Sequence, residues 1–120
     1  MSSPTFGVVL CKVGAAGLAV AAEQVDAIAP NEDEAIDARL AYGFEQSLEG
    51  RAVQCRGRLL RVDSVDVVAT ENVRVLPVPL AIAQAASGAI TGFVELRGAL
   101  WPLVDVPQLV EHLQRAGAAA

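Results

Sequence analysis

Short runs of apolar and β-branched residues, separated by glycine-containing turns, cover most of the chain and predict strands. Alternating or continuous apolar runs of this length are typical of half-buried or buried strands, and glycine supports the tight turns that join them. The expected hairpins join residues 6–13 to 18–20, 52–55 to 59–62, and 90–96 to 99–105. The chain is therefore predicted to be mainly β.

Helix signals interrupt this β pattern at three places. Asn31 as N-cap, with Glu34 three residues later, predicts a helix over residues 31–42 with an acidic, solvated face. Asp105, with Gln108 in the reciprocal position, predicts a helix that runs to Gly117. A third helix is expected from about residue 80 to 86, after Pro77-Val78-Pro79. Two or three short helices should accompany the strands.

One motif occurs twice. Residues 25–29 and 65–69 both fit the pattern V-D-[AV]-[IV]-A, and each copy follows a short apolar strand and a glycine-containing turn. The two copies begin about 40 residues apart, with Asp26 opposite Asp66. This weak repeat predicts two similar β-units in tandem, although chance is an alternative for so short a match.

Composition narrows the class of protein. With 120 residues, 53% of them hydrophobic, the chain has material for one compact domain, and no apolar run reaches the ~18 residues of a membrane span. We expect a cytoplasmic protein, since no secretory signal is evident. The net charge of −5 with a single lysine argues against nucleic acid as a partner. Four arginines between residues 51 and 61 keep RNA binding as a remote alternative, but a solvated strand edge explains them.

Groups for catalysis are missing from the pattern. His112 is the only histidine and lies in no catalytic motif, and no glycine-rich phosphate loop with a lysine follows a strand. Cys11 and Cys55 lie in strand-like runs and are expected to be buried free thiols rather than a disulfide or part of a metal site. We therefore expect no cofactor, no metal and no enzymatic activity, and the chain resembles a binding protein.

The hairpin over residues 90–105 is the most informative segment, because Glu95 and Arg97 lie at its tip and Pro102 interrupts its second strand. Together with its surroundings it resembles the CheW-like family, the coupling proteins that join chemoreceptors to a CheA-type histidine kinase. The parts that carry this resemblance are Val62-Asp63-Ser64-Val65-Asp66-Val67-Val68, Pro77-Val78-Pro79, Gly92-Phe93-Val94-Glu95-Leu96-Arg97-Gly98, Pro102-Leu103-Val104-Asp105 and Leu109.

The resemblance implies a mainly β fold of two SH3-like β-barrel subdomains within a single CheW-like domain. In that family a groove between the barrels takes the receptor tip, and the first barrel helps to bind the kinase regulatory domain. Only one Leu-Arg-Gly hairpin is present here, so we expect a reduced first subdomain over residues 6–30, an acidic helix and connector over 31–50, and a second subdomain over 51–115. The chain is then similar to short accessory members of the FrzB type.

These features predict a non-enzymatic adaptor that binds the cytoplasmic signalling region of chemoreceptors and lacks full coupling to the kinase. Glu95 stands where the family commonly has asparagine, which puts the contacts of the hairpin tip in doubt. Further expected partners are a CheA-type kinase, another CheW-like protein or a second copy of the chain. The candidate partner-binding residues are Val94, Glu95, Leu96, Arg97, Gly98, Leu100, Pro102, Leu103 and Val104.

Other interpretations stay open at this point. Alternate aliphatic residues of the hairpin must be core, and Arg97 can serve only to fix the turn through local carbonyls. The chain can also be a self-assembling structural β-module, because exposed strand edges favour dimerisation. A ligand-binding or enzymatic subunit whose active groups arrive from a partner chain is the third interpretation.

Overall fold

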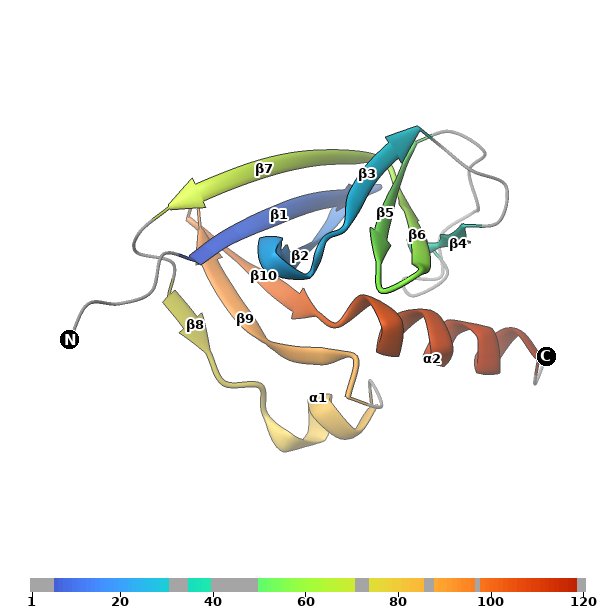
Figure 1. Cartoon of the computed structure of the whole chain (residues 1–120). Coiled ribbons are helices and arrows are strands. Elements are labelled where there is room, and N and C mark those ends of the chain that lie inside the picture. Colours follow the sequence, from blue (N-terminus) through green and yellow to red (C-terminus); the bar gives the residue numbers. More distant parts are fainter. Residues whose placement is uncertain are drawn as a thin grey trace.

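The computed structural model describes residues 6–30, 35–39, 50–70, 74–85, 88–96 and 98–118, and strands predominate among them (Figure 1). The strands are β1 (Phe6–Val13), β2 (Ala16–Ala21), β3 (Ala27–Pro30), β4 (Ile36–Asp37), β5 (Arg51–Cys55), β6 (Arg58–Val62), β7 (Ser64–Thr70), β8 (Arg74–Leu76), β9 (Ile90–Leu96) and β10 (Ala99–Val104). The helices are α1 (Leu80–Ala85), α2 (Val106–Ala118) and a 3-10 turn, η1 (Ala22–Gln24). No helix in the described ranges is long and apolar enough to cross a membrane.

The larger sheet has six strands in the order β7-β1-β2-β10-β9-β8. All neighbours are antiparallel except β2 and β10, which run parallel with Leu103 beside Ala19. Both faces of β1 are covered, since Val9 packs into one core and Val8 into another. A strand buried on both faces does not need to alternate, which explains the continuous apolar run over residues 8–11.

The smaller sheet has four strands in the order β3-β5-β6-β4. Its central hairpin turns at Arg56 and Gly57, whose φ values are 50° and 78°. Positive φ at both central residues is the requirement of a two-residue turn that matches the twist of the strands. The predicted hairpin over residues 52–62 is confirmed, and β4 adds to it in parallel, with Ile36 beside Leu60.

Each sheet combines one hairpin with strands that follow the other hairpin in the chain. In the larger sheet, the β1–β2 hairpin is flanked by β7 and β10. In the smaller sheet, the β5–β6 hairpin is flanked by β3 and β4. In both sheets the first flanking strand is antiparallel and the second is parallel. The chain therefore contains two similar β-units, as the repeat predicted. The first unit is β1 to β4 and the second is β5 to β10, and each contributes strands to both sheets instead of forming a sheet of its own.

Two aspartates occupy equivalent positions in these units. The Asp26 carboxylate accepts a hydrogen bond of 2.8 Å from the backbone N–H of Arg56 in the β5–β6 turn, and the Asp63 carboxylate accepts one of 2.6 Å from Gly14 in the β1–β2 turn. Each aspartate also donates its own backbone N–H to the strand before that turn. The Asp26 N–H donates to the Gln54 carbonyl and the Asp63 N–H to the Lys12 carbonyl, both at 2.8 Å. The predicted alignment of Asp26 with Asp66 is wrong, because η1 adds residues to the first unit only.

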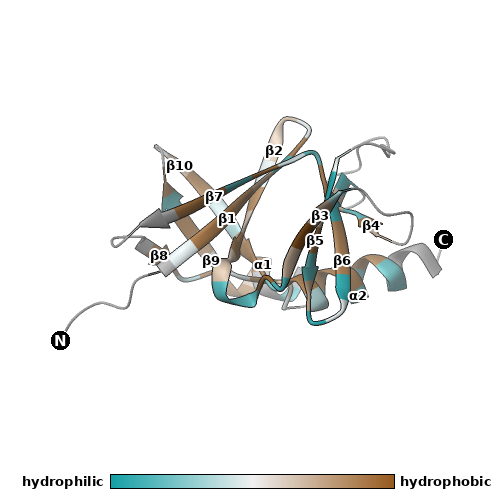
Figure 2. Cartoon of the chain, turned by 45° about the horizontal axis from the view of Figure 1, so that its top comes forward, coloured by the Kyte–Doolittle hydropathy of each residue, from teal (hydrophilic) through white to brown (hydrophobic). Residues whose placement is uncertain are grey.

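Two hydrophobic cores stabilise this arrangement. The first lies between the sheets and α2, and includes Val9, Cys11, Leu18, Val20, Val53, Cys55, Leu60, Val62, Val106, Leu109, Val110 and Leu113. The second is enclosed by the larger sheet and consists of Val8, Leu10, Ala19, Val94 and Trp101. Hydrophobic and hydrophilic residues alternate along α2 (Figure 2), which buries one face against β6.

The predictions for the second and third helices agree with the structure in the main. Asp105 caps α2 as expected, because its carboxylate accepts a hydrogen bond of 3.1 Å from the N–H of Gln108. The helix continues through Gly117 to Ala118, so the prediction that Gly117 ends it is wrong. The α1 helix begins at Leu80 as predicted.

The predicted helix over residues 31–42 is wrong for residues 35–37, and only residues 38 and 39 of the described part are helical, in a 3-10 turn. Ile36 and Asp37 form β4, while residues 31–34 and 40–42 lie outside the described residues. Pairing with β6 buries this segment, since Asp37 is only 4% exposed and Ala38 is fully buried. A capping signal stabilises a short helix only weakly, so sheet pairing and core burial outweigh it.

Strand exchange also changes the expected layout. The proposed division into residues 6–30 and 51–115 does not coincide with the two sheets, because both ranges contribute strands to each sheet. Neither sheet closes into a barrel: the strand orders end at β7 and β8 in the larger sheet and at β3 and β4 in the smaller one. The prediction of a mainly β fold with short helices is confirmed.

Candidate functional site

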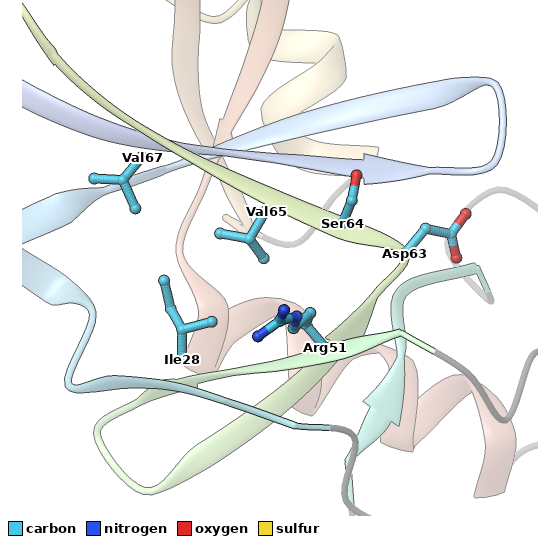
Figure 3. A pocket seen from close by; sticks show the side chains of 6 residues that line it. All are labelled: Ile28, Arg51, Asp63, Ser64, Val65 and Val67. Carbon is cyan, nitrogen blue, oxygen red and sulfur yellow. The ribbon is translucent and has the colours of Figure 1, made fainter.

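A groove opens between the two sheets, where their end strands β3 and β7 lie opposite each other (Figure 3). It contains a cavity of about 310 Å³. The residues that line it are Ile28, Arg51, Asp63, Ser64, Val65 and Val67. Because β3 and β7 follow equivalent hairpins, the groove lies between equivalent strands of the two units.

The walls of the groove carry exposed aliphatic side chains. Val67 on β7 is 62% exposed and Ile28 on β3 is 36% exposed, while the half-buried Val65 packs against the first core. Figure 3 shows Ile28 facing the β7 side chains across the cavity. Large aliphatic residues that remain exposed on both sides of a groove indicate a docking surface.

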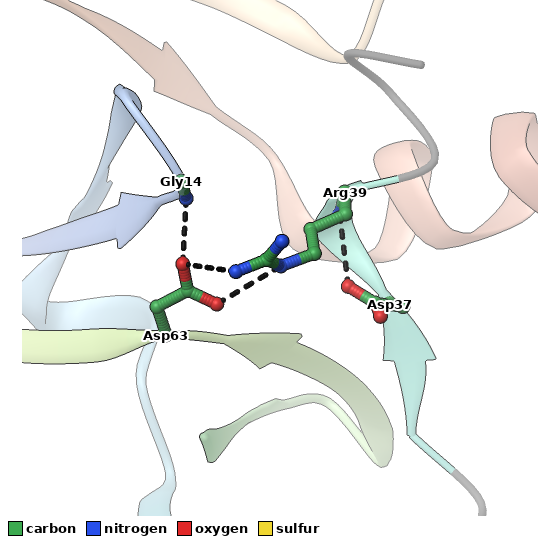
Figure 4. A network of polar contacts seen from close by, with 4 residues as sticks. All are labelled: Gly14, Asp37, Arg39 and Asp63. Carbon is green, nitrogen blue, oxygen red and sulfur yellow. Dashed lines mark hydrogen bonds and ion pairs between the residues drawn. The ribbon is translucent and has the colours of Figure 1, made fainter. Parts of the chain in front are cut away.

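Asp63 fixes one end of the groove to the rest of the fold. Its carboxylate accepts hydrogen bonds from the Arg39 guanidinium at 3.1 Å (Nε) and 2.8 Å (Nη2), in addition to the one from Gly14 (Figure 4). The backbone N–H of Arg39 donates to the Asp37 carboxylate at 2.9 Å. A two-point contact of this kind is stronger than a single ion pair. Asp63 therefore ties the β1–β2 turn to the segment that follows β4.

Arg51 brings a positive charge to the same groove. It is exposed at the start of β5, opposite Pro30 of β3 and Val62 of β6. Figure 3 shows its side chain extending from β5 toward Val65 on β7. The sequence did not predict that Arg51 lines a groove, because residue 51 lies close to β7 only after the two sheets pack against each other.

The β9–β10 hairpin divides the predicted partner-binding residues into two groups. Val94 is fully buried in the second core and Val104 is 5% exposed in the first, so neither is available to a partner in this fold. Leu96 and Leu103 are partly buried and pack against the second core. Four of the predicted interface aliphatics are therefore occupied within the fold.

The exposed part of the hairpin is smaller than expected. Leu100 is 58% exposed, Glu95 and Gly98 are exposed, and Pro102 is half-buried. Gly98 has a φ of 73°, as the predicted turn requires. Arg97 lies outside the described residues. Contact of this hairpin with a partner stays a prediction, with Glu95 and Leu100 as its accessible side chains.

The two cysteines do not form a reactive centre. Both are buried free thiols, as predicted. Burial, and then the neighbouring Cys55, raise the pKa of Cys11 to about 12. Burial, and then the charges of Asp26 and Asp105, raise the pKa of Cys55 to about 11. Thiols with such a high pKa are poor nucleophiles at neutral pH. Among the described residues, no group of three His, Cys, Asp or Glu side chains could hold a metal ion.

No protein-family model and no curated protein sequence match the chain, but a solved structure has a similar fold. The scaffolding protein TtCheW from Thermoanaerobacter tengcongensis is similar to this chain with a TM-score of 0.63 and 13% sequence identity. The match covers 85% of this chain and 90% of that chain. The chain has the CheW fold.

The share of the TtCheW chain that is matched can be compared with the expectation that the first subdomain is reduced. Since 90% of TtCheW has a counterpart here, the comparison does not support missing material in the first β-unit. The first unit supplies β1 to β4, and two of these strands lie at the centre of the larger sheet. This CheW fold is therefore built from two intertwined units, and a reduced first subdomain over residues 6–30 stays a prediction.

Proposed function

We propose that the chain is a non-enzymatic adaptor of a chemotaxis-like signalling array, and that it binds the cytoplasmic signalling region of a chemoreceptor in the groove between β3 and β7. The observation that carries this proposal is the open groove between the two sheets of a CheW fold, with exposed aliphatic side chains on both walls. Buried aliphatic anchors supply most of the affinity of such interfaces, and charges at the rim tune specificity.

Val67 tests the groove directly, because its side chain is the most exposed aliphatic one in the lining. Binding should bury it, and burying a valine side chain contributes about 1.5–3 kcal/mol. We expect Val67→Asp to weaken binding to the purified signalling fragment of a chemoreceptor from the same organism about tenfold or more, measured by titration calorimetry.

Val75→Asp is the matched control. Val75 is 46% exposed on β8, at the opposite end of the larger sheet, and lines no part of the groove. The control should bind the fragment like the wild type. Wild-type affinity of a folded Val67→Asp variant would contradict docking in the groove, and a wild-type chain that binds no receptor fragment would contradict the adaptor function.

We further propose that coupling to a CheA-type kinase is incomplete. Glu95 supports this proposal: the family commonly has asparagine at this position of the hairpin, and a carboxylate is exposed here instead. An exposed carboxylate in place of a neutral amide changes the charge of the hairpin tip, and charges at the rim of an interface set specificity and the rate of encounter. Receptor binding is thereby proposed for the groove and a kinase contact for the β9–β10 tip, in place of the first-subdomain contact that the family resemblance implied.

A further inference from the structure

Arg51 is a charged residue of the groove that has no ion-pair partner among the described residues. The other charged lining residue, Asp63, is engaged by the Arg39 guanidinium and by the Gly14 N–H. Within the described residues, no carboxylate lies at ion-pair distance from Arg51, whereas Arg39 and Arg58 each have one, Asp63 and Glu111. Arg51 is therefore a positive charge of the groove with no carboxylate partner among the described residues, on a chain whose overall charge is −5.

Aliphatic side chains surround this charge. Ile28 lies on β3, and Val65 and Val67 lie on β7, so that the guanidinium extends into a cavity with aliphatic side chains on both walls and Asp63 and Ser64 at one end (Figure 3). A docked segment that covers these aliphatic side chains excludes water from the groove, and this strengthens the attraction of Arg51 for an opposite charge. They equally favour an aliphatic group beside that charge.

We propose that the groove recognises a protein segment in which a carboxylate side chain stands next to an aliphatic one, with Arg51 as the residue that selects the carboxylate. The aliphatic group contacts Ile28 and Val67, and the carboxylate pairs with the Arg51 guanidinium. A cavity of about 310 Å³ lies at the lower end of the range of ligand pockets, which suits a few side chains of a docked segment. This inference rests on the proposed function, since it assigns the partner chemistry of the same groove.

The chain offers a matched pair of variants. Arg51→Glu and Arg56→Glu make the same change of charge in the same hairpin, but Arg56 is exposed in the turn and lines no part of the groove. Arg51→Glu should weaken binding to the receptor signalling fragment about tenfold or more, and Arg56→Glu should leave it within about twofold of the wild type. Thermal melts verify that both variants fold.

Small peptides test the chemistry independently of any receptor. The probes are acetyl-Leu-Glu-Leu-amide and acetyl-Leu-Gln-Leu-amide, titrated to millimolar concentration while the Arg51 Nε and the Ile28 and Val67 methyl resonances are followed by NMR. The glutamate peptide should shift these resonances in the wild type and in Arg56→Glu. In Arg51→Glu the Ile28 and Val67 methyl resonances should not shift. The glutamine peptide should shift them much less.

The outcomes separate the two proposals. Equal shifts with both peptides, no shifts with either, or receptor binding unaffected by Arg51→Glu would overturn the role of Arg51 while leaving the adaptor function intact. Selective shifts with the glutamate peptide, combined with a wild-type chain that binds no receptor fragment, would support the groove chemistry and overturn the chemoreceptor as its partner.

Discussion

Burial gives Cys11 and Cys55 a measurable influence on stability at alkaline pH. Their pKa values are raised to about 12 and about 11 in the folded chain, while an unfolded cysteine ionises near 8.5. Above about pH 8.5 the unfolded chain loses these protons and the folded chain keeps them, so the free energy of unfolding should fall as the pH rises toward 11. Below about pH 8.5 both states keep these protons, and the stability that the protonated thiols contribute is fully present.

Urea unfolding at pH 8, 9, 10 and 11 measures this effect. The Cys11→Ala/Cys55→Ala variant is the control: it should be less stable at pH 8, because two buried side chains are truncated, but should lose less stability between pH 8 and 11 than the wild type. An equal loss in both proteins would show that other groups cause the alkaline dependence.

Glu95 is the residue on which incomplete kinase coupling depends. Glu95→Asn introduces the residue that the family commonly has and removes one exposed negative charge. We expect it to increase binding to the regulatory domain of a CheA-type kinase several-fold in a pull-down with purified components. Glu23→Asn, an equal charge change at an exposed position of η1, should have no effect. Strong kinase binding by the wild-type chain would contradict the proposal.

Residue-level predictions succeeded where the contact is local. Asp105 and the N–H that it caps are three residues apart, and Arg56 and Gly57 form their turn through their own backbone angles. Asp63 contacts Arg39 and Gly14, which precede it by 24 and 49 positions, and no local sequence pattern predicts contacts between residues so far apart. The groove depends on the same kind of distant packing.

At the scale of elements, Asp26 and Asp63 form a natural matched pair. Both hold the turn of the other unit through a carboxylate, but of the two, Asp63 alone also binds a guanidinium among the described residues. Asp63→Ala should therefore lower the free energy of unfolding by about 1 kcal/mol more than Asp26→Ala, because hydrogen bonds to charged groups contribute about 1.5–3 kcal/mol. Urea unfolding at low ionic strength measures the difference. Equal losses would assign the effect of Asp63 to the turn contact alone.

Hairpins were predictable as elements because their two strands and the turn are contiguous in sequence. The β5–β6 turn and the β9–β10 turn both have glycine at a positive φ, as expected. β4 was not predictable, since its two residues are a strand only because β6 provides a parallel edge next to them. Its acidic surroundings resemble a helix start, and the burial of Asp37 has no local signal.

At the scale of the whole molecule, the intertwined units favour a single domain. That the chain is one domain stays a prediction. Removing either unit takes strands from both sheets, so neither unit can keep a complete sheet without the other. We expect one unfolding transition in calorimetry, with equal calorimetric and van't Hoff enthalpies. Two separated transitions would indicate that the sheets unfold independently and would contradict a single cooperative domain.

Strand exchange also sets the order in which the chain can fold. The β1–β2 hairpin can form early, but Cys11 of β1 pairs with Val65 of β7, and Ala19 of β2 with Leu103 of β10. The larger sheet must therefore close long loops, and the one between β2 and β10 spans more than half of the chain. Topologies dominated by such non-local pairings fold on time scales of milliseconds to seconds. During synthesis, the first hairpin leaves the ribosome well before the strands that cover both its edges, and its unpaired edges are open to other chains in that interval.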